Sequence, residues 1–456
     1  MRDPASFRDP AGRVYRREGV LLRQVNRGFA GQWDQFLASG LYQDLVSGGL
    51  LVSHEEADSS LALDDEAYLV IRPREIPFVS YPYEWAFSQL KDAALATLAI
   101  QERALAHGMS LRDASAYNTQ FVDGRLLLID TLSFEPVRPG APWSAYRQFC
   151  QHFLAPLALM AYRDPRVALL LRDFIDGVPL DLASSLLPAR TRLRPGLAMH
   201  VHAHARAQRR SRTADDGAVR ARVSDSGRLA LLDSLRRTVE GLRWTPSDTP
   251  WASYTTETSY SPAAAASKAQ HVRAFLDRAR HGNVWDVGAN TGTFSAIAAD
   301  AGRPVVAMDA DPGAVEQMYL LVRSGRLAGV TPLVVDVTNP SPAIGWLTRE
   351  RRSLLERGPA DVVLALAIVH HLAIGSNVPL PDISAFFAAI AHELIVEFVP
   401  KEDPQVGAML RSREDVFPGY TITGFRDAFA HDFRLVEELQ IADSRRVLFR
   451  MERRPA

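Results

Sequence analysis

Acidic side chains close three successive apolar segments in the second half of the chain. They are Asp286, Asp309 and Asp336. A strand that passes through a glycine turn into a helix brings backbone amides and carboxylates to one edge of a parallel sheet, where nucleotide-like ligands bind. Asp309 lies about 20 residues beyond such a turn, the spacing of a carboxylate that accepts hydrogen bonds from ribose hydroxyls. The three acids therefore predict a ligand-binding edge of a sheet.

The turn after the first acid reads Gly-Ala-Asn-Thr-Gly at 288–292. Glycine lets the backbone turn sharply and approach a ligand without a Cβ in the way. A dinucleotide site needs Gly-x-Gly-x-x-Gly, so that pyrophosphate can sit on the helix N-terminus. Here Asn290 stands at the second glycine position and Thr293 at the third. The pattern therefore argues against a nicotinamide dinucleotide and favours a ligand without phosphate.

This arrangement resembles the class I S-adenosylmethionine-dependent methyltransferases. The resemblance implies an α/β fold at the C-terminus, with a Rossmann-like doubly wound sheet, and S-adenosyl-L-methionine as the cofactor. It also implies that Asp286 orients the methionine end, Asp309 holds the ribose hydroxyls and Asp336 holds the adenine amino group. The residues that would shape the turn are Gly288, Asn290 and Gly292. Asn290 departs from the pattern, since most of the family has glycine there.

Two adjacent histidines are the expected catalytic residues. His370 and His371 follow the apolar segment 361–366, at the end of a strand where a ligand of a doubly wound sheet lies. An imidazole titrates near neutrality and could take a proton from a hydroxyl or amine nucleophile. A packing role is the alternative for either histidine, and the sequence does not choose between the two.

An aromatic, hydroxyl-rich segment precedes this domain. Its aromatic residues Trp251, Tyr254 and Tyr260 could cover the site and stack on a substrate or on a sulfonium. The alternative is that they pack between domains.

A second pattern occurs in the first half of the chain. Asp113 and Asn118 have the spacing Asp-x-x-x-x-Asn, and an apolar segment then ends at Asp130. This resembles the catalytic loop and the metal-binding acid of protein kinases and aminoglycoside phosphotransferases. The resemblance implies an α+β kinase-like domain, with Asp113 as the base and with Asn118 and Asp130 as magnesium ligands.

The remainder of the kinase pattern is poorly matched. No glycine-rich loop of the right spacing precedes Asp113, and no lysine occurs before Lys91, although Arg72 or Arg23 could take the place of a phosphate-binding lysine. Three interpretations stay open: a kinase-like fold without phosphotransfer, an active phosphotransferase, and coincidence.

The predicted organisation has three parts. A kinase-like α+β domain covers 1–244 and contains a mobile, Arg-, Asp-, Ser- and Gly-rich loop at 205–228. A linker or lid follows at 245–262, and the class I methyltransferase domain covers 263–456.

Composition limits the class of protein. With 52 basic and 53 acidic residues the formal net charge is −1, so no global field recruits nucleic acid or an anionic membrane. Cys150 is the only cysteine, and the first residues lack the apolar core of a secretion signal, so we expect a cytoplasmic protein. The scarcity of lysine suggests the coding bias of a GC-rich bacterium. His200 and His204 share a helix face, but no nearby acid or cysteine completes a metal site, so we expect no metal.

Taken whole, the chain resembles a group of bacterial methyltransferases related to a nodulation protein. The stretches that carry this resemblance are Asp-Ala-Ser-Ala-Tyr-Asn at 113–118 and Ile-Asp-Thr-Leu-Ser-Phe-Glu at 129–135. We therefore expect methyl transfer from S-adenosyl-L-methionine to an oxygen or nitrogen of a small molecule, a sugar or glycan, or a peptide. The alternatives are a bifunctional enzyme that also phosphorylates and a non-catalytic module that senses the cofactor.

Overall fold

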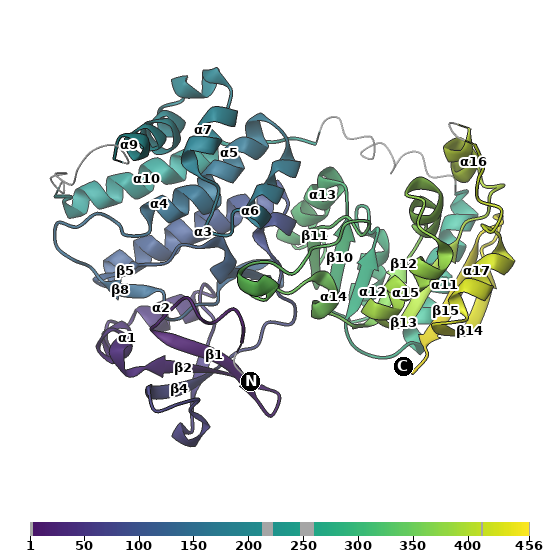
Figure 1. The fold of residues 1–456 in the computed structure, drawn as a ribbon, viewed down its shortest axis with the longest axis horizontal. Coiled ribbons are helices and arrows are strands. Elements are labelled where there is room, and N and C mark those ends of the chain that lie inside the picture. The colour runs from purple at the N-terminus through teal and green to yellow at the C-terminus, as the bar shows by residue number, and fades with distance from the viewer. Residues whose placement is uncertain (1–2, 212–221, 247–259, 412–413, 456) are drawn as a thin grey trace. The chain divides into compact units, whose positions relative to one another are not determined.

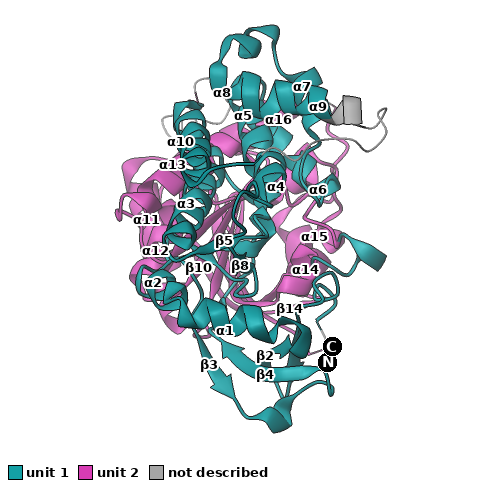
Figure 2. Cartoon of the chain, turned by 90° about the vertical axis from the view of Figure 1, so that its left-hand side faces the viewer, with its two compact units in different colours: residues 1–245, 344–351 teal, residues 246–343, 352–456 magenta. Residues whose placement is uncertain are grey.

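The chain separates into two compact units (Figure 2). The computed structural model describes residues 3–211, 222–246, 260–411 and 414–455. Unit 1 comprises Met1–Thr245 together with Ile344–Arg351, and unit 2 comprises Pro246–Ala343 and Arg352–Ala456. Within the described ranges, no helix is long and apolar enough to cross a membrane.

Unit 1 begins with an antiparallel four-stranded sheet, drawn in purple in Figure 1. Its strands, in the order β1-β2-β4-β3, are β1 (Gly12–Arg17), β2 (Val20–Asn26), β3 (His54–Ala57) and β4 (Ala67–Pro73). Glu18 and Gly19, with φ of 51° and 83°, form the two-residue turn between β1 and β2, a geometry that matches the twist of paired strands. Two helices, α1 (Ala30–Ala38) and α2 (Leu41–Ser47), follow β2.

A long helix and two small hairpin-like sheets form the middle of unit 1. Helix α3 (Phe87–Ala106) buries Leu90, Ala94 and Leu98, which recur at helical spacing. The small sheets pair β5 (Met109–Leu111) with β8 (Phe134–Pro136), and β6 (Thr119–Val122) with β7 (Arg125–Leu128). The short turn η4 (Ala116–Asn118) lies between β5 and β6. These strands position the Asp-x-x-x-x-Asn segment and the acid that follows it.

The remainder of unit 1 is helical. Its helices are α4 (Tyr146–Phe149), α5 (Ala155–Tyr162), α6 (Leu170–Asp173), α7 (Leu180–Leu186), α8 (Pro195–Leu197), α9 (His204–Ser211) and α10 (Asp225–Gly241), with π-helical stretches η5 (Cys150–Leu154) and η8 (Ala198–Ala203). Both ends of the loop predicted at 205–228 are helical, because α9 extends to Ser211 and α10 starts at Asp225. The hydroxyl of Ser224 accepts a hydrogen bond from the backbone N–H of Gly227 and so begins α10. Residues 212–221 lie outside the described part of the chain.

Unit 2 is built on a seven-stranded sheet in the order β11-β10-β9-β12-β13-β15-β14. The strands are β9 (Val284–Val287), β10 (Val305–Asp309), β11 (Val330–Val334), β12 (Ala360–Ala365), β13 (Ala391–Phe398), β14 (Phe433–Gln440) and β15 (Val447–Arg453). The first five in this order pair in parallel, and β15 pairs antiparallel with both of its neighbours. The predicted Rossmann-like sheet is therefore present, with one reversed strand.

Helices cover both faces of this sheet. One face packs against α11 (Pro262–Arg278), α12 (Thr293–Asp300) and α13 (Pro312–Arg323), through a core that includes Phe275, Ile297 and Met318. On the other side, α15 (Leu380–Ile390) packs against β12, β13 and α17 (Ile422–Phe429), and α14 (Leu354–Arg357) and α16 (Pro404–Leu410) are shorter. Strands buried on both faces need nearly continuous apolar sequence, which makes an acid inside them conspicuous.

Candidate active site

The turn after β9 has left-handed backbone at three positions. Gly288, Asn290 and Gly292 have φ of 75°, 50° and 86°. Asparagine tolerates this region better than most residues with a Cβ, which explains how Asn290 can stand where glycine is usual. The backbone N–H of Asn290 donates to Asp309 Oδ2 at 2.8 Å. The turn is therefore tied to the acid that ends the neighbouring strand β10.

Asp286 is buried inside β9, with 2% of its surface exposed. Its Oδ2 accepts a hydrogen bond from Ser295 Oγ, on α12, at 2.6 Å. Burial raises the pKa of the Asp286 carboxyl to about 6, and the hydrogen bond from Ser295 and the charge of Lys268 oppose this shift. A carboxylate held in this way gains a favourable partner when a cationic group binds beside it.

The other two predicted acids differ in exposure. Burial raises the pKa of Asp309, whose Oδ1 also accepts a hydrogen bond from the backbone N–H of Asp311 at 2.9 Å. Asp336 is exposed beyond the end of β11, and its Oδ1 accepts hydrogen bonds from the backbone and hydroxyl of Thr338 at 2.9 and 2.6 Å. The sheet order places β9, β10 and β11 side by side, so all three acids lie at or near the carboxyl ends of adjacent strands.

These residues fit a cofactor of the predicted type. The side-chain oxygen of Asn290 is buried and has no hydrogen-bond partner among the described residues. An orphaned acceptor in a ligand-binding turn suits a ligand that donates hydrogen bonds. S-adenosyl-L-methionine offers an ammonium, ribose hydroxyls and an adenine amino group, which are all donors that acidic and amide oxygens accept.

His370 and His371 lie where the sequence predicts, after β12 and at the start of the π-helical stretch η10 (His371–Gly375). Their ring centroids are 4.2 Å apart. Burial lowers the pKa of His370 well below its ordinary value, and the neighbouring charges of His371, Arg446 and Lys268 lower it further. Burial and the charge of Arg446 also lower the pKa of His371. Both imidazoles are therefore held neutral, and their catalytic role stays a prediction.

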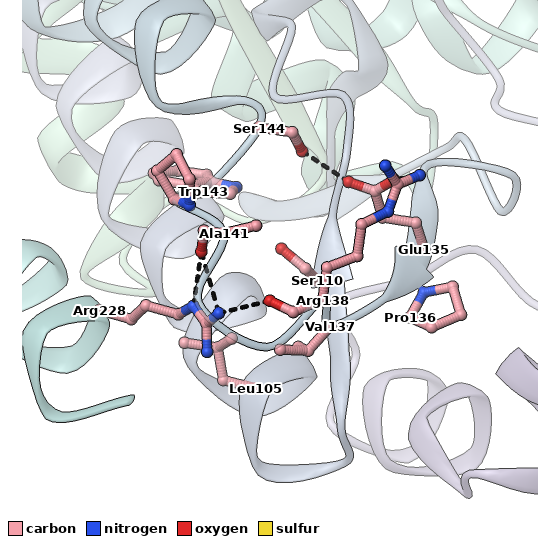
Figure 3. Close-up of a pocket in the computed structure, with 11 residues that line it drawn as sticks. Leu105, Ser110, Glu135, Pro136, Val137, Arg138, Ala141, Trp143, Ser144 and Arg228 are labelled. Carbon is pink, nitrogen blue, oxygen red and sulfur yellow. Dashed lines mark hydrogen bonds and ion pairs between the residues drawn. The ribbon is translucent and has the colours of Figure 1, made fainter. Parts of the chain in front are cut away.

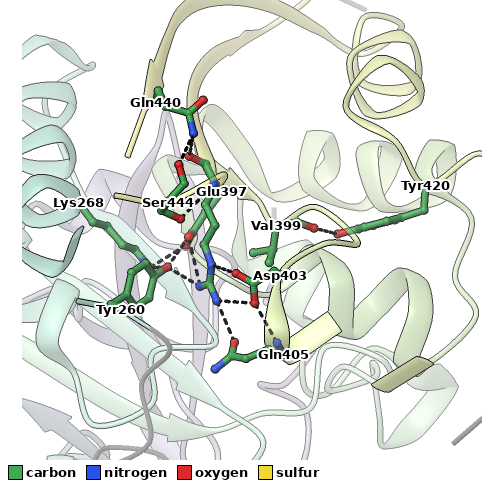
Figure 4. Close-up of polar contacts among 10 residues, drawn as sticks. Tyr260, Lys268, Glu397, Val399, Asp403, Gln405, Tyr420, Gln440 and Ser444 are labelled. Carbon is green, nitrogen blue, oxygen red and sulfur yellow. Dashed lines mark hydrogen bonds and ion pairs between the residues drawn. The ribbon is translucent and has the colours of Figure 1, made fainter. Parts of the chain in front are cut away.

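A buried polar network lies at the carboxyl end of β13 (Figure 4). Glu397 has no exposed surface, and its Oε1 accepts a hydrogen bond from the hydroxyl of Tyr260. Lys268 Nζ on α11 lies 2.7 Å from Glu397 Oε2. Arg446 donates to Tyr260 at 2.6 Å and pairs with Asp403 at 2.7 Å. Of the predicted aromatic residues, Tyr260 belongs to this network, whereas Trp251 and Tyr254 lie outside the described residues.

Sequence reasoning missed the importance of Glu397. The signal was present, because Glu397 stands inside the apolar stretch Leu-Ile-Val-Glu-Phe-Val at 394–399. An acid that interrupts a strand buried on both faces must find partners inside the protein.

The kinase-like residues of unit 1 come together. Asp113 Oδ1 accepts hydrogen bonds from the backbone of Ser115 at 3.0 Å and from Gln148 Nε2 at 2.7 Å. Burial raises the pKa of Asp113, and the nearby charge of Asp130 raises it further, while the hydrogen bonds from Ser115 and Gln148 oppose the shift. The backbone N–H of Ile129 donates to the Asn118 carbonyl at 2.8 Å, which joins the two segments.

Arg23 forms an ion pair with the carboxylate of Asp130. Its Nη2, reaching from β2, lies 2.6 Å from Asp130 Oδ1, and both side chains are mostly buried. Burial raises the pKa of Asp130, but Arg23 and hydrogen bonds from Ser133 and the backbone of Leu132 hold it below its ordinary value. Arg72 on the adjacent strand β4 is exposed. The acid that would bind a metal in a phosphotransferase is thus neutralised by the protein itself.

We interpret a small pocket in unit 1 as part of the packing of that unit rather than as a ligand site. It is lined by residues of β8, α10 and the segment between β8 and α4 (Figure 3). The buried guanidinium of Arg228 on α10 donates to the carbonyl oxygens of Ala141 at 3.0 Å and Arg138 at 2.6 Å. The hydroxyl of Ser144 donates to Glu135 at 2.8 Å. These polar groups are satisfied by one another and fasten α10 to the loop.

The histidines near residue 200 bind hydroxyl groups. His200 contacts the hydroxyls of Tyr146 at 2.8 Å and Ser234 at 2.9 Å, through both ring nitrogens. His202 contacts those of Ser184 and Thr191 at 2.8 and 2.9 Å. In the ranges that the structure describes, no group of three or more His, Cys, Asp or Glu residues is placed to hold a metal ion.

The sheet order, the glycine turn and the acids at the strand ends define unit 2 as a Rossmann-like methyltransferase fold. The chain belongs to the family of the nodulation protein NoeA, because it is 36% identical to NoeA of Rhizobium meliloti (strain 1021) over 458 residues, which cover 98% of this chain and 95% of NoeA. The predicted relation to a nodulation protein is confirmed. No family model matches the chain.

Solved structures of methyltransferases also show a likeness to this chain. The N-methyltransferase NodS from Bradyrhizobium japonicum WM9, in complex with S-adenosyl-L-homocysteine, is 14% identical, with 46% of this chain and 93% of NodS covered and a TM-score of 0.32. The bifunctional kinase-methyltransferase WbdD is 16% identical, with 44% and 41% covered and a TM-score of 0.30. The magnesium protoporphyrin IX methyltransferase ChlM from Synechocystis PCC 6803, with bound SAM, is 19% identical, with 42% and 80% covered and a TM-score of 0.30.

Proposed function

We propose that this protein transfers a methyl group from S-adenosyl-L-methionine to an oxygen or nitrogen of a small molecule, a sugar or glycan, or a peptide. The observation that carries the proposal is the hydrogen bond between the turn and the acid of β10, from Asn290 N–H to Asp309 Oδ2 at 2.8 Å. It fixes the left-handed turn against the carboxylate that would hold a ribose. A nucleoside can therefore bind at this edge without a phosphate-binding loop.

Each acid has a role in holding the cofactor, which supplies an electrophilic methyl group when it is bound. Asp286 attracts the ammonium of the methionine end, since it is a buried carboxylate at the turn. Asp309 accepts hydrogen bonds from the ribose hydroxyls, and Asp336 accepts one from the adenine amino group. Gly288 and Gly292 keep the backbone of the turn in the left-handed region, where a side chain would be strained.

His370 and His371 remain the proposed residues on the acceptor side of β12. Both are held neutral by burial, as the lowered pKa values of the two rings show. A neutral imidazole can accept a hydrogen bond or a proton from a nucleophile, and general-base help of this kind contributes about 10²–10⁴-fold in rate. Either histidine can do this, and the other would then orient it.

We further propose that unit 1 is a kinase-like scaffold that does not transfer phosphate. The bifunctional alternative is favoured by one observation, the gathering of Asp113, Asn118 and Asp130. It is opposed by Arg23, whose guanidinium already neutralises Asp130. A magnesium ion would have to displace this arginine.

Calorimetric titration of the full chain with S-adenosyl-L-homocysteine tests the proposed cofactor. We expect a dissociation constant on the order of 1–100 µM, within the usual range for enzyme ligands. Titration with adenosine alone is the control and should be much weaker, because adenosine lacks the ammonium that Asp286 attracts. Absence of binding at millimolar S-adenosyl-L-homocysteine would overturn the proposal.

A further inference from the structure

Glu397 and Asp286 lie on the same face of the unit 2 sheet. In the register of the parallel strands, Asp286 is level with Leu364 of β12, and Leu364 is level with Ile395 of β13. Glu397 is two residues further along β13, so its side chain points to the same face, beyond Asp286 and toward the carboxyl ends of the strands. This is the edge where a ligand of a doubly wound sheet lies.

Lys268 connects the two acids. It reaches from α11, which covers this face, and its Nζ lies 2.7 Å from Glu397 Oε2. The charge of Lys268 also acts on Asp286. Its ammonium lies 4.5 Å from the ring centroid of Phe294, the second residue of α12. Through Lys268, Glu397 is therefore linked to the segment that carries the glycine turn, although it comes 109 residues after Gly288 and 111 residues after Asp286.

His370 supplies an independent sign that a ligand belongs here. It is fully buried, and neither of its ring nitrogens has a hydrogen-bond partner among the described residues. It lies close enough to Lys268 and Arg446 for the charges of both to act on it. Buried polar groups are almost always paired, so the unpaired imidazole marks the place of a polar group that the ligand brings.

Arg446 and Tyr420 already have partners in the protein, so we do not assign them to the binding of a ligand. Arg446 is bound to Asp403 by two hydrogen bonds, at 2.7 and 3.0 Å, and to Gln405 at 3.2 Å. Tyr420 donates to the carbonyl of Val399 at 2.8 Å (Figure 4). These side chains hold the end of β13, whereas both ring nitrogens of His370 have no hydrogen-bond partner among the described residues.

We propose that Glu397 is the acceptor-side carboxylate of unit 2, and that it binds the N–H or O–H group that receives the methyl. The inference rests on the proposed function and deepens it. Tyr260, which donates to Glu397 Oε1, and Lys268 are positioning residues that hold the carboxylate in place. The acceptor class is an uncharged amine or a hydroxyl, because the atom that receives the methyl needs a free lone pair.

In the proposed step one proton moves to Glu397, one bond forms to the methyl carbon and one bond to sulfur breaks. The proton leaves the acceptor nitrogen or oxygen and bonds to a Glu397 oxygen, so in this step His370 and His371 serve as hydrogen-bond acceptors rather than as the base. The acceptor lone pair forms the new bond to the methyl carbon as the carbon–sulfur bond breaks, and the electron pair of that bond remains on sulfur. Glu397 later returns its proton to water.

Sinefungin can test this inference without knowledge of the acceptor. In this cofactor analogue an amine-bearing carbon replaces the methylated sulfur, so its amine occupies the position of the transferred methyl. We expect the full chain to bind sinefungin more tightly than S-adenosyl-L-homocysteine, which lacks the amine. Glu397→Gln should reduce that preference by about tenfold, the usual scale of one charge-assisted hydrogen bond.

Glu393→Gln is the matched control. Glu393 lies on the same strand and face, four residues nearer the amino end, where it pairs with Arg450 at 3.1 Å. This variant should keep the sinefungin preference. Because Glu397→Gln leaves Lys268 buried without its acid, the double variant Lys268→Met, Glu397→Gln provides a second measurement that carries no unpaired charge. It should lose the preference as well.

The outcomes separate the inference from the proposed function. If neither ligand binds the wild-type chain, the proposed function fails. If both bind and the ratio of their affinities is the same in wild type, Glu397→Gln and the double variant, the cofactor site stands and the role of Glu397 is overturned. If Glu393→Gln lowered the ratio of the two affinities as much as Glu397→Gln does, the role of Glu397 would also be overturned. The effect would then not depend on a carboxylate at the carboxyl end of β13.

Discussion

The two units contain aspartates in similar positions after short strands, but their partners differ. In unit 1, Asp130 is paired with Arg23 at 2.6 Å, and Asp113 accepts hydrogen bonds from Gln148 and Ser115. In unit 2, Asp286 accepts a hydrogen bond from Ser295 and Asp309 accepts two from the backbone, while the side-chain oxygen of Asn290 in the same turn has no partner among the described residues. The unit 1 acids are satisfied by the protein, whereas the unit 2 site has polar capacity left for a ligand.

This difference shows that residue spacing alone does not establish an active site. The spacing of Asp113, Asn118 and Asp130 matches a phosphotransferase pattern, and the fold brings the three together. A single arginine from β2 then supplies the charge that a metal would supply. What a cluster of acids can bind depends on which partners the fold has already given them.

The largest expected effect is on the stability of unit 1. Arg23→Ala should lower the free energy of unfolding by about 3 kcal/mol at neutral pH, because it leaves Asp130 as a buried, uncompensated charge. The pKa of Asp130 is depressed in the folded state, so the stabilisation is present above the pKa of the unfolded carboxyl, about 4, and is lost as the pH falls through the folded value. Urea unfolding followed by tryptophan fluorescence at pH 7 and pH 3 measures both.

Arg72→Ala is the control for this variant. Arg72 is exposed on the adjacent strand β4, and its removal should change stability by less than about 0.5 kcal/mol. Equal losses in the two variants would mean that the Arg23–Asp130 pair does not distinguish unit 1 from unit 2.

The next effect concerns the cofactor site of unit 2. Asp309→Ala should weaken binding of S-adenosyl-L-homocysteine by about 10- to 100-fold, since hydrogen bonds to a charged group contribute about 1.5–3 kcal/mol. It removes both the acceptor for the ribose and the anchor of the Asn290 backbone. Calorimetry measures the change, with Asp300→Ala, at the exposed end of α12, as the control that should bind normally. Unchanged affinity in Asp309→Ala would refute the ribose assignment.

A smaller effect is expected from pH. Burial raises the pKa of Asp286 to about 6, so below that pH the free protein takes up a proton there and loses the charge that attracts an ammonium. Affinity for S-adenosyl-L-homocysteine should therefore be constant from pH 7 to 8 and fall by up to about tenfold per unit below pH 6. Asp286→Asn should bind more weakly at pH 7 and lose this dependence. A wild-type affinity that stays constant down to pH 5 would contradict the role given to Asp286.

Most of the proposed cofactor site could be predicted from the sequence, because its residues are close together in the chain or follow one another on adjacent strands. The residues from Asp286 to Gly292 form one strand-turn-helix segment, and the next acids follow the adjacent strands β10 and β11 in chain order. Even the departure at Asn290 has a local explanation in its φ of 50°.

The acceptor side could not be predicted in the same way, because its contacts join distant parts of the chain. Tyr260 and Glu397 are 137 residues apart, and Tyr260 and Arg446 are 186 apart. Their meeting depends on the register of β13 with the antiparallel β15 and on the placement of α11 across the sheet. For Arg23 the sequence offered Arg72 as an equal alternative, and the pairing of β2 with β4 places only one of the two beside Asp130.

The smallest expected effect is the response of the full chain to ATP with magnesium, which should give no measurable heat of binding in calorimetry. Magnesium prefers carboxylate and phosphate oxygens in a near-octahedral shell, and the Asp130 oxygens are engaged by Arg23, Ser133 and Leu132. Asp113→Asn should leave S-adenosyl-L-homocysteine affinity within about twofold of wild type, because Asp113 belongs to unit 1 and, in the described part of the chain, shares no hydrogen-bond partner with the acids of unit 2. Clear ATP binding to wild type that is abolished in Asp130→Asn would reverse the comparison, since unit 1 would then hold a working nucleotide site despite its arginine. ATP binding that appears only in Arg23→Ala would support the comparison, because one side chain would then account for the difference between the two units.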